Sequence, residues 1–126
     1  MQDFKKLKVW EKSHRFVLRA YGVVSEFPKD ELYGITSQLR RAASSIPTNI
    51  AEGCGRGSSA ELGRFLQIAM GSASETEYHL ILARDLKFLK EKDFEQLTVE
   101  VVQIKKMLFA LIKKIRTQNN TLTTEY

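Results

Sequence analysis

Apolar residues recur with a helical period in four segments of the chain. The segments are separated at residues 27–30, 53–57 and 91–93, where proline, glycine or polar residues interrupt the pattern. The last segment is the clearest, with apolar residues alternately three and four positions apart: Phe94, Leu97, Val101, Ile104, Leu108, Leu111 and Ile115. This heptad spacing is typical of helix bundles. Because short connections join the segments, the pattern predicts an all-α fold, an antiparallel up-down-up-down four-helix bundle.

Local signals set the expected helix ends. The first helix should end before Pro28, since proline disfavours helix at the preceding residue. Pro47 interrupts the second helix, and we predict a kink there rather than a new helix, because the apolar spacing continues through it. Ser58 and Glu61 form a capping box for the third helix, and Asp93 suits the N-cap of the fourth. The expected core face of the first helix is Trp10, Val17, Ala20, Tyr21, Val24 and Phe27.

The third helix is apolar around more than half of its circumference. Besides its core stripe, it carries one row formed by Ile68, Leu82 and Leu86 and another formed by Met70, Ile81 and Phe88. One helix of a monomeric four-helix bundle needs a single apolar stripe. A centrally packed helix is one explanation, and we favour the other, a subunit interface. We expect residues 1–116 to form a single domain and residues 117–126 to be a disordered tail.

Composition and charge narrow the class of protein. The chain has 126 residues, a net charge of +5 and one cysteine, Cys54, which excludes an internal disulfide and a multi-cysteine zinc site. It shows neither an apolar run long enough to span a membrane nor the apolar core of a signal peptide. We therefore expect a cytoplasmic protein that does not enter the membrane.

A basic stripe runs along the first helix. Lys8, Lys12, Arg15 and Arg19 share one side, which we place nearly opposite the apolar side, and Glu11 can pair with Arg15. A solvated outer face would explain this pattern, and a phosphate-binding surface is the alternative. The bundle topology brings further cations to the same end, so the candidate nucleic-acid-binding residues are Lys5, Lys6, Lys8, Lys12, Arg15, Arg19, Arg56, Lys113, Lys114 and Arg116.

A second, polar stripe flanks the apolar side of the two middle helices. It is formed by Gln38, Arg41, Asn49, Glu52, Arg64, Ser72 and Glu75, together with Ser45, Glu61 and His79. We interpret it as a structural network between helices or subunits, and a ligand or partner site is the alternative. Ion pairs such as Arg41–Glu52 or Arg64–Glu75 are sterically possible.

Catalytic and metal-binding patterns are missing from the sequence. Glu75 and His79 share a helix face, but a di-iron bundle needs two Glu-x-x-His motifs and two further glutamates, and the chain has a single such motif, from Glu11 to His14. We therefore expect no enzyme activity, no metal and no cofactor. The loop Gly53–Gly57 could touch an anion through Arg56, although a helix C-cap followed by a tight turn explains most of it.

Several motifs resemble one known family. The run Leu7-Lys8-Val9-Trp10, the run from Tyr33 to Ala43, Ser45-Ile46-Pro47 and Asn49-Ile50-Ala51-Glu52-Gly53 are similar to those of the bacterial four-helix-bundle proteins encoded in intervening sequences of 23S ribosomal RNA genes. Arg56, Arg64-Phe65-Leu66 and the segment from Gly71-Ser72 to Glu75 extend the resemblance, which covers about residues 5–115.

The resemblance implies a bundle that assembles into a ring, a homopentamer. A related group of similar fold, the accessory variability proteins of diversity-generating retroelements, forms pentameric barrels that bind nucleic acid and a reverse transcriptase. Our leading hypothesis is a non-enzymatic ring that binds RNA or DNA through the basic surface of the first and last helices. The alternative is a scaffold that docks a partner protein such as a reverse transcriptase, through the polar stripe or through Val102 and Phe109.

Overall fold

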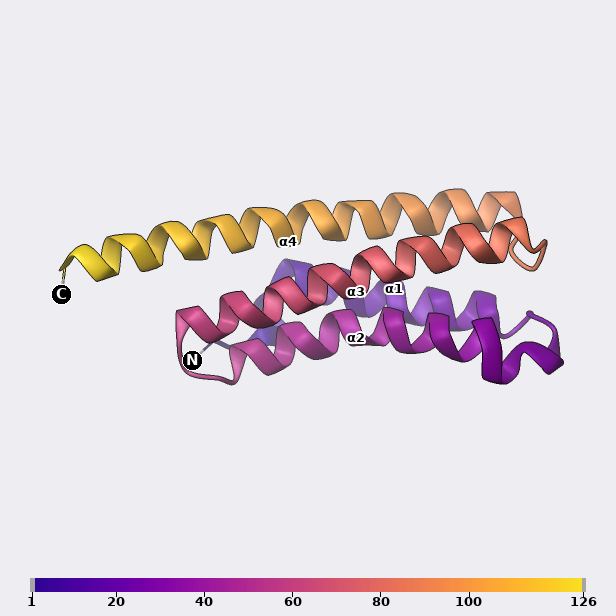
Figure 1. Ribbon diagram of the computed structural model, residues 1–126, viewed down its shortest axis with the longest axis horizontal. Coiled ribbons are helices and arrows are strands. Elements are labelled where there is room, and N and C mark those ends of the chain that lie inside the picture. Colours follow the sequence, from indigo (N-terminus) through magenta and orange to yellow (C-terminus); the bar gives the residue numbers. More distant parts are fainter. Residues whose placement is uncertain (1, 126) are drawn as a thin grey trace.

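The protein is an all-α bundle of four long helices (Figure 1). The computed structural model describes residues 2–125, and the side chains of residues 2–118. The helices are α1 (Lys8–Val24), α2 (Ser37–Cys54), α3 (Ser59–Asp85) and α4 (Glu91–Glu125). Short 3-10 helices, η1 (Phe4–Lys6) and η2 (Lys29–Glu31), and a π-helix, η3 (Leu32–Thr36), lie at the chain start and between α1 and α2. No strand occurs among the described residues.

The helices pack as a bundle in which each contacts two others. α2 packs against α1 and α3, and α4 packs against α3 and α1. In Figure 1 the chain turns back after each helix, so that consecutive helices run in opposite directions. The connection between α1 and α2 and that between α3 and α4 therefore lie at one end, and the α2–α3 loop lies at the other.

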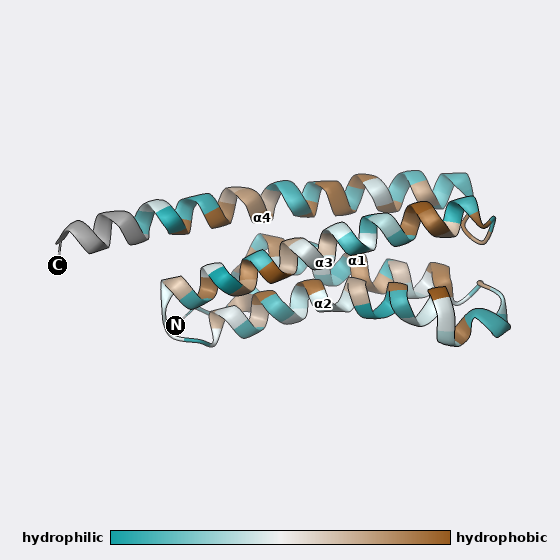
Figure 2. Cartoon of the chain, in the orientation of Figure 1, coloured by the Kyte–Doolittle hydropathy of each residue, from teal (hydrophilic) through white to brown (hydrophobic). Residues whose placement is uncertain are grey.

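The heptad pattern of the last segment predicted the core correctly. Leu97, Val101, Ile104, Leu108 and Ile115 are buried, and Phe94 and Leu111 pack against the core from its edge. Ile112 is also buried, as expected for a helix packed between two neighbours rather than along a narrow seam. Figure 2 shows such apolar residues recurring along all four helices.

The core face of α1 differs from the predicted one. Phe16 has 0% of its surface exposed and lies on a buried face with Val9, Ala20 and Val24, whereas Tyr21 is 42% exposed. Trp10 and Val17 only flank the core. Tryptophan and tyrosine carry polar groups that favour the edge of a core, while phenylalanine has none, so the helix turns Phe16 inward.

The chain enters α2 through irregular backbone. Gly34 has φ −106° and ψ −119°, which interrupts the helical path inside η3. Further on, α2 runs from Ser37 to Cys54 with Pro47 inside it, so no new helix begins at this proline. The kink that we predicted at Pro47 stays a prediction.

The ends of α3 and α4 show which capping signals were reliable. The Ser58 side chain accepts a hydrogen bond from the Glu61 N–H (3.2 Å), as the capping box predicted. α3 ends in a Schellman motif, with Lys87 at φ 70° and the Phe88 N–H bonded to the Ala83 carbonyl (3.0 Å). The predicted N-cap at Asp93 is wrong, because α4 already begins at Glu91.

α4 extends past residue 116, where the sequence predicts the end of the domain. The structure continues α4 as helix to Glu125, whereas the sequence predicts a disordered tail over residues 117–126. Side chains after Gln118 and the last residue lie outside the described residues. The boundary at residue 116 therefore stays a prediction.

Candidate nucleic-acid interface and polar seam

The basic stripe of α1 lies beside α4. Lys8, Lys12, Arg15 and Arg19 line a shallow groove that is closed on the other side by Met107 of α4. The predicted position nearly opposite the apolar side is therefore wrong. The reason is the core face of α1: with Phe16 at its centre, the stripe flanks the core on the α4 side. We call these four side chains and Met107 the α1–α4 groove.

Carboxylates neutralise two of the four cations in the α1–α4 groove. Arg15 pairs with Glu11 at 2.9 Å, as predicted, and Arg19 pairs with Glu100 of α4 at 2.7 Å. Within the described part of the chain, Lys8 and Lys12 have no acidic partner. The two lysines are therefore the residues of this groove that are free to meet a phosphate.

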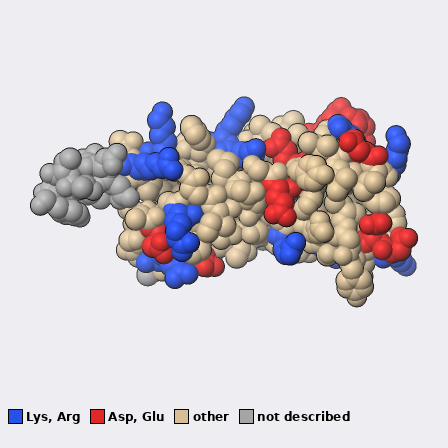
Figure 3. All heavy atoms as spheres, viewed as in Figure 1, with Lys and Arg blue, Asp and Glu red and all other residues tan. Residues whose placement is uncertain are grey.

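The chain start, the α2–α3 loop and the late part of α4 meet at one end of the bundle. Gln2 lines a pocket together with Cys54 and Gly57, and a Cβ at Gly63 would lie 3.9 Å from Cγ2 of Ile115. This end also holds the exposed side chains of Lys5, Lys6, Arg56, Lys113, Lys114 and Arg116. In Figure 3 basic side chains gather over this half of the molecule, whereas several acidic ones lie at the opposite end.

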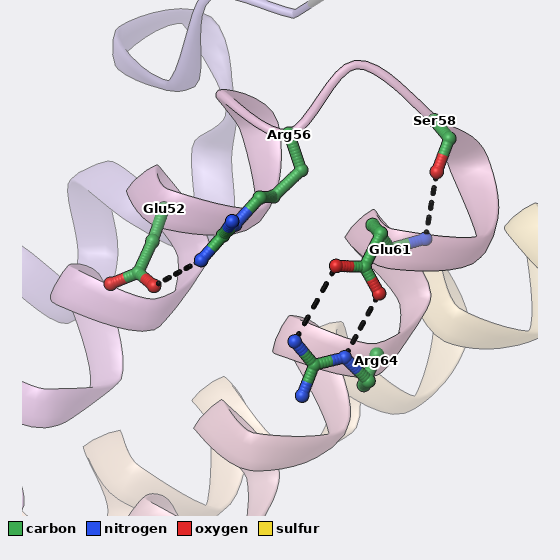
Figure 4. Close-up of polar contacts among 5 residues, drawn as sticks. All are labelled: Glu52, Arg56, Ser58, Glu61 and Arg64. Carbon is green, nitrogen blue, oxygen red and sulfur yellow. Dashed lines mark hydrogen bonds and ion pairs between the residues drawn. The ribbon is translucent and has the colours of Figure 1, made fainter.

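The α2–α3 loop carries a cluster of two ion pairs (Figure 4). Arg56 pairs with Glu52 at 3.2 Å, and Arg64 pairs with Glu61 at 2.9 Å through a two-point contact. The pairs Arg41–Glu52 and Arg64–Glu75 do not form within the described residues, because the two members of each pair lie eleven positions apart on one helix, and Glu52 and Arg64 have nearer partners. Arg64 and Arg56 also lower the pKa of Glu61, the hydrogen bond from Arg64 being the main cause.

Phe65 joins the two ion pairs to the core. The guanidinium carbon of Arg56 lies 4.9 Å from the Phe65 ring centre, and that of Arg64 lies 4.6 Å from it. Phe65 itself is buried, and its Cβ atom packs against Gly53 of α2. The two arginines therefore stay close to the surface of the loop, where their free N–H groups remain available to an anion.

A polar seam joins the middle of α2 to α3. The Ser72 hydroxyl donates to the Ser45 hydroxyl (3.1 Å), and the Asn49 side-chain amide donates to the same hydroxyl (3.0 Å) and to the Ser45 carbonyl (2.8 Å). Asn49 and Ser72 thus share one partner, the Ser45 hydroxyl. Gln38, Arg41 and Glu75 of the predicted stripe are exposed. They form no hydrogen bond to this seam through their side chains within the described residues.

His79 extends the polar seam into the core. The side chain is only 6% exposed, and its Nδ1 atom is buried without a hydrogen-bond partner. Burial lowers the pKa of the imidazole, Glu75 raises it, and Arg41 lowers it. The sequence placed His79 on the polar stripe, but it did not show that the ring is desolvated.

The burial of His79 predicts a pH dependence of stability. Since the folded protein holds the His79 proton less tightly than the unfolded chain, the unfolded chain binds more protons below the ordinary histidine pKa of about 6.5. The free energy of unfolding should therefore fall as the pH drops below that value. We expect a lower melting temperature at about pH 5.5 than at about pH 7.5. The variant His79→Gln should lose most of this difference, and the exposed-site control His14→Gln should keep it.

The glycine loop and its cysteine offer little reactive chemistry. Ser58 already accepts the Glu61 N–H, and Cys54 is a buried free thiol. Burial, and to a smaller extent Asp3, raises the pKa of this thiol, so it stays protonated and weakly nucleophilic.

No cluster of histidine, cysteine, aspartate and glutamate in the described residues could hold a metal ion. Likewise, none of the helices in the described part is long and apolar enough to cross a membrane.

An apolar groove on α3 and α4 accompanies the basic surface. It is lined by Met70, Val102 and Phe109, and the pair Lys105–Glu77 (3.0 Å) lies across it. Phe109 is 64% exposed, so its ring contributes little to the bundle core. The sequence had singled out Phe109 and Val102 among the late lysines, and the structure brings them together.

The fold and these surfaces define a small all-helical bundle with a basic groove and a polar seam. A family model described as 23S rRNA-intervening sequence protein matches residues 5–110, and the chain belongs to this family. The chain is similar to a crystal structure from Bacteroides thetaiotaomicron, described as a protein with unknown function from the S23 ribosomal protein family. The two chains are 28% identical and superpose with a TM-score of 0.78. The match covers 83% of this chain and 95% of the other. A comparison with curated proteins finds no match.

Proposed function

We propose that this protein is a non-enzymatic bundle that assembles into a cytoplasmic, bacterial homopentamer and binds RNA through the basic surface of α1 and α4. One observation carries the binding proposal: Lys8 and Lys12 of α1 and Lys113 and Lys114 of α4 have no acidic partner among the described residues. RNA is favoured over DNA because the solved relative is assigned to a ribosomal protein family. Contact with phosphates alone gives binding without base readout.

The charge distribution supports the choice of surface. Residues 1–29 hold seven basic and three acidic residues, a net charge of +4. Residues 92–126 hold six basic and four acidic residues, a net charge of +2. Residues 30–57 are neutral, and residues 58–91 carry −1. Since α1 and α4 are packed against each other, their excess charge adds to one field. Assembly of several copies would multiply it around a ring.

Salt dependence of RNA binding tests the proposal. Binding of a single-stranded RNA should weaken linearly on a plot of log K against log salt, since phosphate contacts release counterions. The triple variant Lys113→Gln/Lys114→Gln/Arg116→Gln should reduce the slope of this plot by about 2. The matched control Lys87→Gln/Lys90→Gln/Lys92→Gln removes three exposed charges at the other end and should leave the slope unchanged. A flat plot for the unaltered protein, or equal slopes for both variants, would contradict RNA binding.

Exposed apolar residues on α3 support the assembly. Ile68, Tyr78 and Ile81 of α3 remain exposed. Large apolar side chains left exposed on one helix are typical of subunit interfaces. Light scattering should give a multiple of the 14.4 kDa chain mass, and the variant Ile68→Asp/Tyr78→Asp should give the monomer. A mass of one chain for the unaltered protein would contradict the ring.

The second candidate function is a protein-interaction scaffold. The observation that favours it is the groove on α3 and α4, where the exposed Phe109 ring lies beside Met70 and Val102. Aromatic side chains in such positions are common anchors of protein interfaces. The variant Phe109→Ala separates the two functions: it should leave the salt slope of RNA binding unchanged and weaken only the docking of a protein such as a reverse transcriptase.

A further inference from the structure

A pocket lies at the end of the bundle remote from the α2–α3 loop. It measures about 190 Å³ and is formed where α1 ends and α2 begins. Its walls are apolar, formed by Val24, Phe27, Pro28 and Leu32, and Thr36 and Arg40 also line it, with Lys29 exposed at its rim. The volume corresponds to about six water molecules at about 30 Å³ each, which is room for a small organic molecule.

Two hydrogen-bond donors of this pocket lack acceptors. Thr36 is 3% exposed, and its Oγ1 atom is buried without a partner. The Nε atom of Arg40 is buried and unpaired as well. Buried polar groups in proteins are nearly always hydrogen-bonded, so two unpaired donors on one pocket wall indicate a missing acceptor.

Arg40 also lacks a counter-charge. Its guanidinium lies 5.3 Å from the centre of the Tyr21 ring, and it forms no ion pair within the described residues. The next residue, Arg41, is exposed, so water hydrates its guanidinium, whereas Arg40 is half-buried. A half-buried arginine stacked on an aromatic ring is a common recognition group for carboxylates.

The backbone at the pocket is irregular. Leu32 and Thr36 belong to the π-helix η3, and Gly34 between them has non-helical dihedral angles. Thr36 and Arg40 are four positions apart where α2 begins, so both side chains lie on one helix face beside the pocket.

We propose that this pocket binds a small monocarboxylate with an apolar body. The carboxylate oxygens accept hydrogen bonds from the Arg40 guanidinium and the Thr36 hydroxyl, and Lys29 adds positive charge at the rim. The apolar body packs against Phe27, Pro28 and Leu32. Binding turns the Arg40 and Thr36 donors toward the ligand, a movement that no existing hydrogen bond of these atoms opposes.

Titration of the full chain with phenylacetate, followed by backbone amide chemical shifts, tests this site. We expect saturable shifts at Leu32, Thr36 and Arg40, and none with phenylacetamide or inorganic phosphate. Arg40→Gln should weaken binding at least about tenfold, because it removes a charge-assisted hydrogen bond. The matched control Arg116→Gln, at the opposite end, should bind as the unaltered protein does.

Thr36→Val distinguishes a ligand contact from a structural role. Valine has the same shape and no hydroxyl, so the melting temperature should stay the same or rise while phenylacetate binds several-fold more weakly. This variant also decides the outcome if Arg40→Gln does not fold. The proposal is overturned by any of three results: no saturable binding at about 10 mM phenylacetate, equal binding of phosphate or phenylacetamide, or unchanged affinity in the variants that fold.

Discussion

The variant Phe16→Ala should lose about 3–5 kcal/mol of the free energy of unfolding. Phe16 is the large apolar side chain at the centre of the buried face of α1, with 0% of its surface exposed. Its removal forfeits the burial of an aromatic ring and leaves a cavity that the surrounding helices fill only in part. Small domains are stable by about 5–15 kcal/mol, so the loss is a large share of the total.

Urea unfolding followed by circular dichroism measures this effect. The control is Leu18→Ala on the same helix, two positions further on, where the side chain is 60% exposed. It should change the free energy of unfolding by less than about 0.5 kcal/mol. Comparable losses in the two variants would show that Phe16 does not lie in the core as described.

The variant Gly53→Ala should also destabilise the bundle, by about 1–3 kcal/mol. A Cβ atom at Gly53 would lie 2.8 Å from the Phe65 Cβ, closer than carbon atoms pack, and 3.2 Å from Cδ1 of Leu62, a tight contact. Because the nearest atom is a Cβ fixed to the backbone, α3 must move away from α2. That movement outweighs the better helix propensity of alanine, about 1 kcal/mol.

Gly22→Ala is the matched control for this prediction. Gly22 lies in α1, and a Cβ there would meet nothing within 4 Å. The same substitution should therefore stabilise the protein by up to about 1 kcal/mol, through helix propensity alone. Thermal unfolding of both variants should show shifts of opposite sign, and a shift of the same sign would contradict the close approach of α2 and α3.

The parts of the fold that follow from periodicity could be predicted from the sequence. The seam of α4 was correct at Leu97, Val101, Ile104 and Leu108 because an unbroken heptad leaves one choice of face. On α1, several faces carry apolar residues, and the choice among them depends on neighbours that a single helix pattern does not contain. Phe16 was missed for this reason. Because the core face was misplaced, the position of the basic stripe relative to it was wrong as well.

The candidate site was predictable in composition but less so in geometry. The sequence grouped Asn49 and Ser72 because both flank a core stripe at regular spacing, and both side chains bond to Ser45. The partner of Arg64 also follows from spacing, since Glu61 lies three positions away and Glu75 lies eleven positions away, about 16.5 Å along the helix. The pocket at Thr36 and Arg40 was missed, because it depends on the non-helical backbone at Gly34, which no apolar spacing in the sequence reveals.

The short connections at residues 55–58 and 86–90 have a consequence for how the chain folds. They join helices that are neighbours in sequence and in space, so α2, α3 and α4 find their partners through local contacts. Low contact order of this kind is associated with folding in microseconds to milliseconds. Contact between α1 and α4 must close the longest stretch of chain and carries the largest loop entropy. The basic groove between these helices is therefore expected to be the last surface that the folding chain completes.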